Sequence, residues 1–322
     1  MSLEYHANNA YKDPYLKRRK RRKLVLALLI ILAAGFLVAG GYYAISRIET
    51  SLPKRETKVA KSRVLELWAS REYDSVLAAC DHSLAIDPLD SFYLAFKGFA
   101  LFYSAMAEPD TDLRLPLIDS SIFALRRSLI DAPPNLEGNI LYILGKAYYH
   151  KGVDYHDNAL EHLEAATRTG SEASDIWEYM ALASYQAGLI DNSVDYFSQA
   201  VALTPGSPEL LLAAAMANYE AENYARAEGL AIDAVEKASD AYLKERCMFL
   251  LGNIYRSTDR LPEALQRYES IKANNPESAD AWYYEGLIFQ QMNDAIKARA
   301  SWRRAVAIDP MHQGARQKLA ER

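Results

Sequence analysis

Apolar residues are concentrated in one early block of the chain, whereas the later part alternates apolar and polar positions with a helical period. Residues 24–45 are 22 consecutive positions without a charged side chain. A helix of that length rises about 33 Å, which matches a hydrocarbon layer of about 30 Å. Tyr42 and Tyr43 lie near its end, where aromatic side chains favour the membrane interface. The block predicts a transmembrane helix.

The charges on either side of this block predict its orientation. Residues 1–23 form a short basic tail with eight Lys or Arg and two acidic residues, and Lys17–Lys23 is an unbroken basic run. On the other side, Glu49 and Glu56 dilute the basic residues in and after the polar linker 46–56. Because the more basic flank stays in the cytoplasm, we expect a cytoplasmic N-terminus and a body on the far side of the membrane.

A cleaved signal peptide is the alternative interpretation of the apolar block. Its apolar region is normally 7–15 residues long and ends at an Ala-x-Ala-like site. The block here is longer, and Val38-Ala39-Gly40 is a poor cleavage site. These features favour an uncleaved anchor.

A helical repeat occupies residues 57–312. Proline turns follow apolar-periodic runs at Pro88, Pro133, Pro205, Pro276 and Pro310, and the C-terminal part fits a frame of 34 residues. Proline ends a helix because it disfavours helical backbone in the residue before it. Turns that recur at a regular spacing indicate a repeat architecture. These turns divide residues 57–312 into seven units: 57–90, 91–135, 138–173, 174–207, 208–241, 245–278 and 279–312.

Small side chains recur at the eighth position of these units. Two helices approach to 8–10 Å only where the side chains between them are short. The pattern therefore predicts an all-α chain of paired helices. The residues at this position are Val64, Gly98, Gly145, Ala181, Ala215, Gly252 and Gly286.

These units resemble the tetratricopeptide repeat family. The resemblance covers almost everything after residue 56, and the last unit carries it most clearly. It implies a right-handed solenoid of about seven helix-turn-helix repeats, with residues 313–322 as a C-terminal cap. The family positions in the last unit are Trp282, Gly286, Phe289, Ala298, Trp302, Ala305 and Pro310.

Three units depart from the regular frame. Residues 57–90 are degenerate in their first helix and are interpreted as a cap. Residues 91–135 carry about eleven extra positions, expected between the two helices near residues 108–112. Residues 138–173 carry two extra positions near Val153 and Asp154. Insertions in solenoids usually form loops on one face, so loops are expected at both places.

The resemblance also implies a concave groove lined by the first helix of each repeat. Its aromatic side chains suit an extended peptide or an amphipathic helix, because rings give large contact area at modest entropic cost. The alternative is that some of these rings pack against neighbouring repeats. The residues expected in the groove are Phe92, Phe99, Phe102, Tyr103, Tyr142, Lys146, Tyr149, Tyr185, Tyr219, Phe249, Asn253 and Tyr283.

Charge and motifs narrow the possible chemistry. Residues 24–322 carry 29 basic and 40 acidic side chains, which argues against nucleic-acid binding. No phosphate-binding loop, nucleophile elbow or zinc signature occurs, so neither an enzyme nor a cofactor is expected. His150, His156 and His162 are interpreted as ordinary helix and loop residues rather than metal ligands. Cys80 is expected to be a small buried side chain, and no disulfide with Cys247 is expected because the two lie several repeats apart.

The sequence therefore predicts a membrane-anchored scaffold that binds other proteins, displayed in the periplasm from a bacterial inner membrane. A fixed component of a large envelope machine, such as a secretion system or a flagellar motor collar, is one alternative. A chaperone-like accessory of a translocon is another. The partner, the pathway and the oligomeric state are left open by the sequence.

Overall fold

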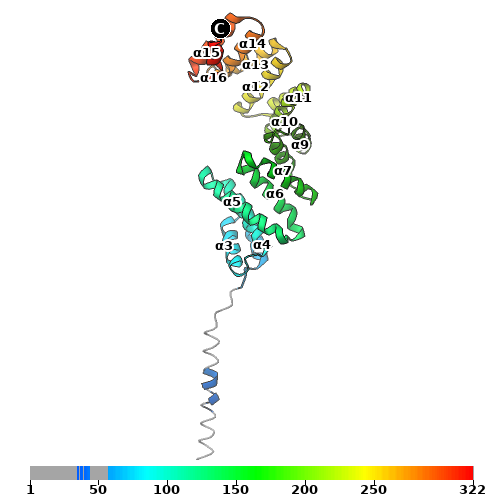
Figure 1. The fold of residues 1–322 in the computed structure, drawn as a ribbon, viewed down its shortest axis with the longest axis vertical. Coiled ribbons are helices and arrows are strands. Elements are labelled where there is room, and N and C mark those ends of the chain that lie inside the picture. Colours follow the sequence, from blue (N-terminus) through cyan, green and yellow to red (C-terminus); the bar gives the residue numbers. More distant parts are fainter. Residues whose placement is uncertain (1–34, 36, 39, 44–56, 322) are drawn as a thin grey trace, which may run out of the picture. The chain divides into compact units, whose positions relative to one another are not determined.

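The computed structural model describes residues 35, 37, 38, 40–43 and 57–321 (Figure 1). The predicted tail and linker lie outside these residues, and so does most of the predicted membrane span over residues 24–45. The described residues between 35 and 43 are helical. Over the part of the chain that is described, no helix is long and apolar enough to cross a membrane. The chain divides into two units, Met1–Thr57 and Lys58–Arg322.

The second unit consists of seven consecutive helical hairpins and a final helix. Two short 3₁₀ helices, Leu129–Asp131 and Val153–Tyr155, follow α5 and α6, and the described residues contain no strand. The all-helical fold is thus confirmed. The helices are α2 (Lys61–Ala69), α3 (Tyr73–Ile86), α4 (Ser91–Ala107), α5 (Thr111–Ser128), α6 (Pro134–Lys151), α7 (His156–Arg168), α8 (Ile176–Gln186), α9 (Ile190–Leu203), α10 (Pro208–Glu220), α11 (Tyr224–Lys237), α12 (Ala241–Ser257), α13 (Leu261–Asn274), α14 (Ala279–Gln291), α15 (Ala295–Ile308) and α16 (Gln313–Ala320).

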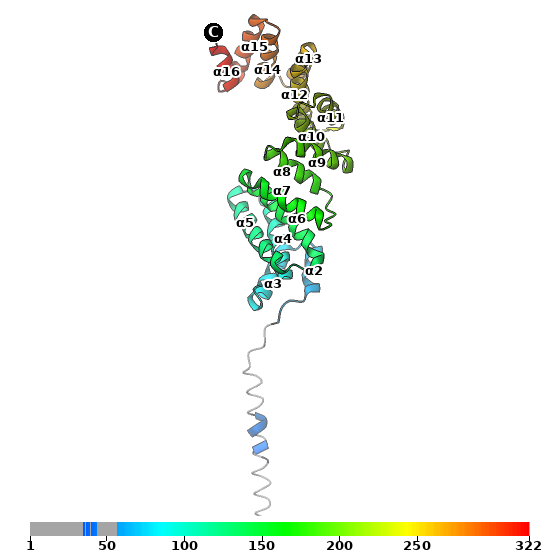
Figure 2. The same cartoon turned by 45° about the vertical axis from the view of Figure 1, so that its right-hand side comes forward.

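Neighbouring hairpins pack on one another in chain order. Each helix from α2 to α16 contacts the next, and α4 also packs on α6, α6 on α8 and α10 on α12. Figures 1 and 2 show the hairpins following one another from α3 to α15. The buried side chains form continuous clusters that extend across several hairpins. Each hairpin therefore covers the apolar face of its neighbour, as expected of a repeat array.

The turn inside most hairpins uses one residue in the left-handed backbone conformation. The residue two positions after the end of the first helix has φ near +59° at Arg71, Glu222, Asp259 and Asn293, and φ of 77° at Gly188. Left-handed residues commonly end helices because they let backbone amides bond the last carbonyls. The second and third hairpins, α4–α5 and α6–α7, have no such residue at the matching place, because these are the units with extra residues.

Close approach of the paired helices explains the small side chains at the eighth position. A Cβ added to Gly98 would lie 2.5 Å from the Leu125 side chain, and one added to Gly145 would lie 2.6 Å from Leu163. Both distances are shorter than ordinary carbon contacts of about 3.5 Å. The predicted reason for small residues at this position is confirmed by these distances.

The extra residues of the second repeat do not form the expected loop. They lengthen the two helices instead, so that α4 has 17 residues and α5 has 18, joined only by residues 108–110. Asp110 starts α5 early because its side chain accepts a hydrogen bond from the amide of Asp112 at 2.9 Å. In the third repeat the two extra residues form the 3₁₀ turn Val153–Tyr155 after Gly152.

Two first helices begin four residues before the predicted repeat starts at residues 138 and 245. Helix α6 begins at Pro134, a residue suited to the first helical position because its missing amide would be unpaired there anyway. Helix α12 begins at Ala241 because Asp240 accepts a hydrogen bond from the amide of Leu243 at 2.8 Å.

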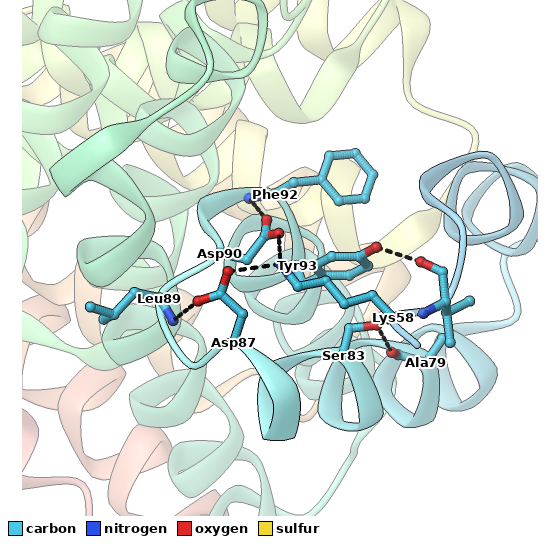
Figure 3. Close-up of polar contacts among 9 residues, drawn as sticks. Lys58, Ala79, Ser83, Asp87, Leu89, Asp90, Phe92 and Tyr93 are labelled. Carbon is cyan, nitrogen blue, oxygen red and sulfur yellow. Dashed lines mark hydrogen bonds and ion pairs between the residues drawn. The ribbon is translucent and has the colours of Figure 1, made fainter. Parts of the chain in front are cut away.

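Residues just before α2 are fastened to the turn between α3 and α4 (Figure 3). Lys58 Nζ lies 2.7 Å from a carboxylate oxygen of Asp87 and of Asp90. The hydroxyl of Tyr93 donates a hydrogen bond to the carbonyl of Val59, whose amide donates to Ser83 Oγ at 3.1 Å. We call these contacts the Lys58 clasp. It attaches the start of the second unit to α3, α4 and the turn between them.

Candidate binding groove on the first helices of the hairpins

A pocket of about 240 Å³ lies where the first helices of the first three hairpins meet. The half-buried rings of Trp68 on α2, Tyr103 on α4 and Tyr142 on α6 border it. Asn139, which is exposed, lies at its edge. Ring faces with hydroxyl groups at their edges suit a partner that offers both apolar contacts and hydrogen bonds. Its full lining is Trp68, Phe96, Phe99, Tyr103, Leu136, Asn139, Tyr142 and Ile143.

Trp68 is the central ring of an aromatic wall beside this pocket, which consists of Trp68, Tyr73, Phe96, Phe99 and Tyr103. Its ring centroid lies 5.6 Å from those of Tyr73 and Tyr103 and 5.7 Å from those of Phe96 and Phe99. Tyr73 and Tyr103 stack on each other with centroids 5.5 Å apart. Such ring pairs contribute about 0.5–1.5 kcal/mol each beyond their burial. The wall is therefore a fixed surface rather than a set of independent rings.

Three of the predicted groove residues are core residues. Phe92, Phe99 and Phe102 expose only 7%, 4% and 1% of their surface, although one side of Phe99 also lines the pocket beside Trp68. The cause is the position of α4, which packs against α2, α3, α5 and α6 at once. The alternative that rings of the second repeat pack on neighbouring repeats holds for these three side chains.

Tyr142 and Lys146, both predicted groove residues, share a carboxylate that the sequence did not reveal. Lys146 Nζ lies 2.9 Å from Asp175 Oδ2 and donates to the hydroxyl of Tyr142 at 3.0 Å. The hydroxyl of Tyr142 in turn donates to Asp175 Oδ1. Burial and the hydrogen bond to Asp175 raise the pKa of Tyr142 far above its ordinary value. The phenol is therefore a stable donor at any physiological pH.

The charge of Asp175 is maintained by its partners. Burial alone would raise the pKa of this carboxyl, but hydrogen bonds from Tyr142 and Lys146 outweigh burial and hold the pKa below its usual range. Lys146 exposes only 8% of its surface, whereas the Asp175 side chain is 35% exposed. The pair thus presents one partly open carboxylate at the groove, with its cation behind it.

Aromatic rings surround the ammonium group of Lys146. Its Nζ lies 4.4 Å from the ring centroid of Tyr179, 5.0 Å from that of Tyr142 and 5.9 Å from that of Phe102. Cations within about 6 Å of a ring centroid are attracted by the ring quadrupole. Rings and carboxylate together explain how a lysine can be buried at this place.

Tyr149, another predicted residue, continues the aromatic surface from Tyr142 to the fourth hairpin. Its ring centroid lies 5.4 Å from that of Tyr179, whose hydroxyl lies 3.1 Å from Nε2 of His150. Burial and, to a smaller extent, the nearby charges of Lys146 and Arg114 together lower the pKa of His150 to about 4. His150 is therefore a neutral hydrogen-bonding group at neutral pH.

The remaining predicted residues do not join this site. Tyr185, Tyr219, Phe249, Asn253 and Tyr283 are half-buried on α8, α10, α12 and α14. Their contacts run within a hairpin or to the next one. The Tyr219 hydroxyl lies 3.1 Å from Ser257 Oγ, Tyr268 donates to Asn253 at 3.2 Å, and the ring of Tyr283 lies 4.9 Å from His312. These contacts indicate that the five side chains contribute to packing within and between hairpins as much as to a binding surface.

Four residues of the site were missed by the sequence argument. Trp68 belongs to the first repeat, which was taken as a degenerate cap, although α2 is the first helix of that repeat. Asp175 directly precedes the first helix of the fourth repeat and Glu178 lies in its first turn, but neither is aromatic. Tyr179 follows Glu178 on the same helix. A search of the frame for charged as well as aromatic residues would have found Asp175 and Glu178.

The histidines and cysteines have structural surroundings. His156 packs on the Tyr149 ring with centroids 5.4 Å apart, and His162 Nδ1 lies 2.7 Å from the carbonyl of Asn158. Cys80 and Cys247 are fully buried in different hairpins, as predicted for Cys80. Among the residues described, no three His, Cys, Asp or Glu side chains gather in a metal-binding arrangement. The groove thus offers rings, hydroxyls and carboxylates for binding.

Comparison with known proteins identifies the repeat. A family model described as tetratricopeptide repeat matches residues 156–208 and 249–312. A TPR repeat-containing protein of Methanocaldococcus jannaschii is 24% identical over 170 residues, which is 52% of this chain and 29% of that protein. The chain thus spans less than a third of the length of this curated relative.

Solved structures are similar to this chain at low identity. The C-terminal part of a TPR repeat-containing protein from Cytophaga hutchinsonii is 16% identical, with a TM-score of 0.59, and the match covers 81% of this chain and 99% of that one. YrrB, described as a TPR protein with an unusual peptide-binding site, is 18% identical with a TM-score of 0.49, and the match covers 60% of this chain and 96% of YrrB. At such identities the similarity concerns the fold alone.

Proposed function

Residues 156–208 and 249–312 match the tetratricopeptide repeat family, and from that premise we propose that the chain is a non-catalytic scaffold that binds a peptide segment of other proteins. The segment lies along the first helices α4, α6 and α8, with an apolar side chain in the pocket beside Trp68, Tyr103 and Tyr142. Apolar anchors in pockets of this kind supply most of the affinity of peptide recognition.

One observation carries this proposal: a fixed aromatic wall is half-exposed beside a hydrogen-bonded carboxylate. A purely structural core would bury the Tyr103 and Tyr142 rings completely, as it does Phe102. Instead the two rings border a pocket of about 240 Å³, and Tyr142 leads directly to Asp175. Apolar surface next to a few fixed polar groups is typical of binding sites.

We further propose that residues 24–45 anchor the scaffold in a bacterial inner membrane, with the repeats in the periplasm. The support is the sequence: 22 uncharged residues directly after the basic run Lys17–Lys23. An uncharged helix of that length matches the hydrocarbon layer, and the basic flank favours the cytoplasmic side. Protease digestion of spheroplasts tests this topology. Loss of the repeats on digestion supports it, whereas protection of the repeats contradicts it.

Site-specific cross-linking tests the binding proposal. A photo-reactive amino acid replaces Asn139 at the pocket edge of the full-length protein in cells, and a matched position, Tyr242, carries it on an exposed part of α12. We expect partner cross-links from position 139 only, and we expect Tyr103→Ala to reduce them while Tyr242→Ala does not. Equal cross-linking from both positions, or no effect of Tyr103→Ala, contradicts the proposal.

The same experiment separates two kinds of scaffold. An adaptor or a chaperone-like accessory gives cross-links to several transient partners. A fixed component of an envelope machine gives one partner that co-purifies at constant stoichiometry.

A further inference from the structure

We propose that the bound segment carries lysine or arginine among apolar residues, and that its cation lies against Glu178 and Glu209 beside Asp175. This inference rests on the proposed function and adds the chemistry of the partner. The argument starts from the charges along the groove next to the aromatic pocket.

Three carboxylates lie at the starts of two successive first helices. Asp175 directly precedes α8, Glu178 is in the first turn of α8, and Glu209 is in the first turn of α10. Lys146 is ion-paired with Asp175. These four side chains together carry a charge of three minus and one plus, or -2. This stretch of the groove therefore attracts positive charge.

Glu178 lacks a partner of its own. It is half-buried, and within residues 57–321 no hydrogen bond or ion pair to its side chain is present, while Glu209 accepts only from the hydroxyl of Ser207 at 3.1 Å. Burial raises the pKa of Glu178, the negative charge of Asp175 raises it further, Lys146 opposes this rise, and Glu209 adds a smaller rise of its own. A cation from a partner would offset both the burial of the Glu178 carboxylate and its repulsion by the neighbouring carboxylates.

The neighbouring rings favour a cation at the same place. Glu178 directly precedes Tyr179 on α8, and the ring centroid of Tyr179 lies 5.4 Å from that of Tyr149. Burial raises the pKa of both tyrosines, and the charge of Glu178 adds to both, after that of Asp175 at Tyr179. The ammonium group of Lys146 already lies 4.4 Å from the Tyr179 ring centroid. A second cation between Glu178 and the exposed ring surface would repeat a contact that the protein itself makes.

The aromatic pocket and the carboxylates belong to one continuous surface. Tyr142 borders the pocket and donates to Asp175, which directly precedes α8 and lies three residues before Glu178. A segment with an apolar residue in the pocket therefore brings a nearby basic residue to Glu178. An acidic segment would be repelled at the same place.

Fluorescence anisotropy with the full-length protein in nanodiscs tests this inference. The probes are three labelled peptides with leucine at alternate positions and arginine, glutamine or glutamate between them. The protein variants are the double substitution Glu178→Gln and Glu209→Gln, and the control Glu236→Gln on the exposed surface of α11. We expect the arginine probe to bind about tenfold more tightly than the glutamine probe, which is the size of one charge-assisted hydrogen bond. The double variant removes that advantage and the control keeps it.

Two kinds of failure are distinguishable. In the first, the probes bind and Tyr103→Ala weakens their binding, but the arginine and glutamine probes bind equally or the double variant behaves like the control. The inference about a basic segment is then wrong, while the proposed binding groove stands. If Tyr103→Ala has no effect or no probe binds, the proposed function and the inference fail together.

Discussion

The indole of Trp302 occupies the space that a side chain on Gly286 would need. A Cβ at Gly286 would lie 2.3 Å from Trp302 Nε1, and that nitrogen donates to the carbonyl of Tyr283 at 3.2 Å. The glycine on α14 and the tryptophan on α15 are thus a matched pair. The absence of a side chain on one helix lets the largest side chain of the other pack against it.

Replacing this glycine should destabilise the last hairpin. We expect Gly286→Ala to lower the free energy of unfolding by about 1–3 kcal/mol, because the added methyl group must displace a packed ring. Gly229→Ala is the matched control, since it is also inside a helix but has open space around its Cβ. It should raise stability by roughly 0.5–1 kcal/mol. Urea denaturation followed by circular dichroism measures both, and equal effects would contradict the packing argument.

Removing the buried ammonium group of Lys146 should leave Asp175 without its cation. We expect Lys146→Met to cost about 1.5–3 kcal/mol, the range for hydrogen bonds to charged groups. Asp175→Asn in the same chain should restore part of that loss, because no uncompensated charge then remains. The measurement is a double-mutant cycle of unfolding free energies. Additive effects of the two substitutions would show that the pair is not coupled.

The pKa of Asp175 predicts how stability responds to acid. Its folded pKa lies below its unfolded value of about 4, so its contribution is fully present above that value and is lost as the pH falls through the lower folded pKa. We expect Asp175→Asn to be less stable than the unsubstituted protein at neutral pH, with a difference that shrinks only below about pH 4. Asp233→Asn, on the exposed face of α11, is the control. A difference that is unchanged in acid would contradict the assignment.

Both cysteines should resist thiol reagents in the folded protein. Burial raises the pKa of Cys80 to about 12 and that of Cys247 to about 11, and neither side chain is exposed. The reactive thiolate is therefore scarce and inaccessible. We expect slow reaction with a disulfide reagent under native conditions and rapid reaction of two thiols in denaturant. Ser120→Cys, at an exposed position on α5, should add one rapidly reacting thiol.

The repeat itself was predictable because one physical constraint recurs in every unit. Small residues at the eighth position reveal where paired helices touch, and the distances at Gly98, Gly145, Gly252 and Gly286 agree with that reason. The pattern also placed the helices approximately. It failed at residues 108–112, because a count of extra residues does not distinguish a loop from two longer helices.

The binding groove was harder to predict because burial depends on what lies beyond a single repeat. The frame placed Phe99 and Tyr103 on the same face of α4, yet Phe99 is buried and Tyr103 is half-exposed. This difference depends on how α4 packs against α2, α3, α5 and α6, which a single repeat does not reveal. Asp175 was missed for a related reason, since it reaches Tyr142 and Lys146 only after the third and fourth hairpins have stacked.

The Lys58 clasp determines which part of the repeats would first bear a pull on the residues before Lys58. Residues 58 and 59 are fastened to Ser83, Asp87, Asp90 and Tyr93, which belong to α3, α4 and the turn between them. A pull on the residues that precede Lys58 therefore passes straight to that turn. Helix α2 follows the point of attachment, so such a pull would bypass α2 and the Trp68 side chain that it contributes to the pocket.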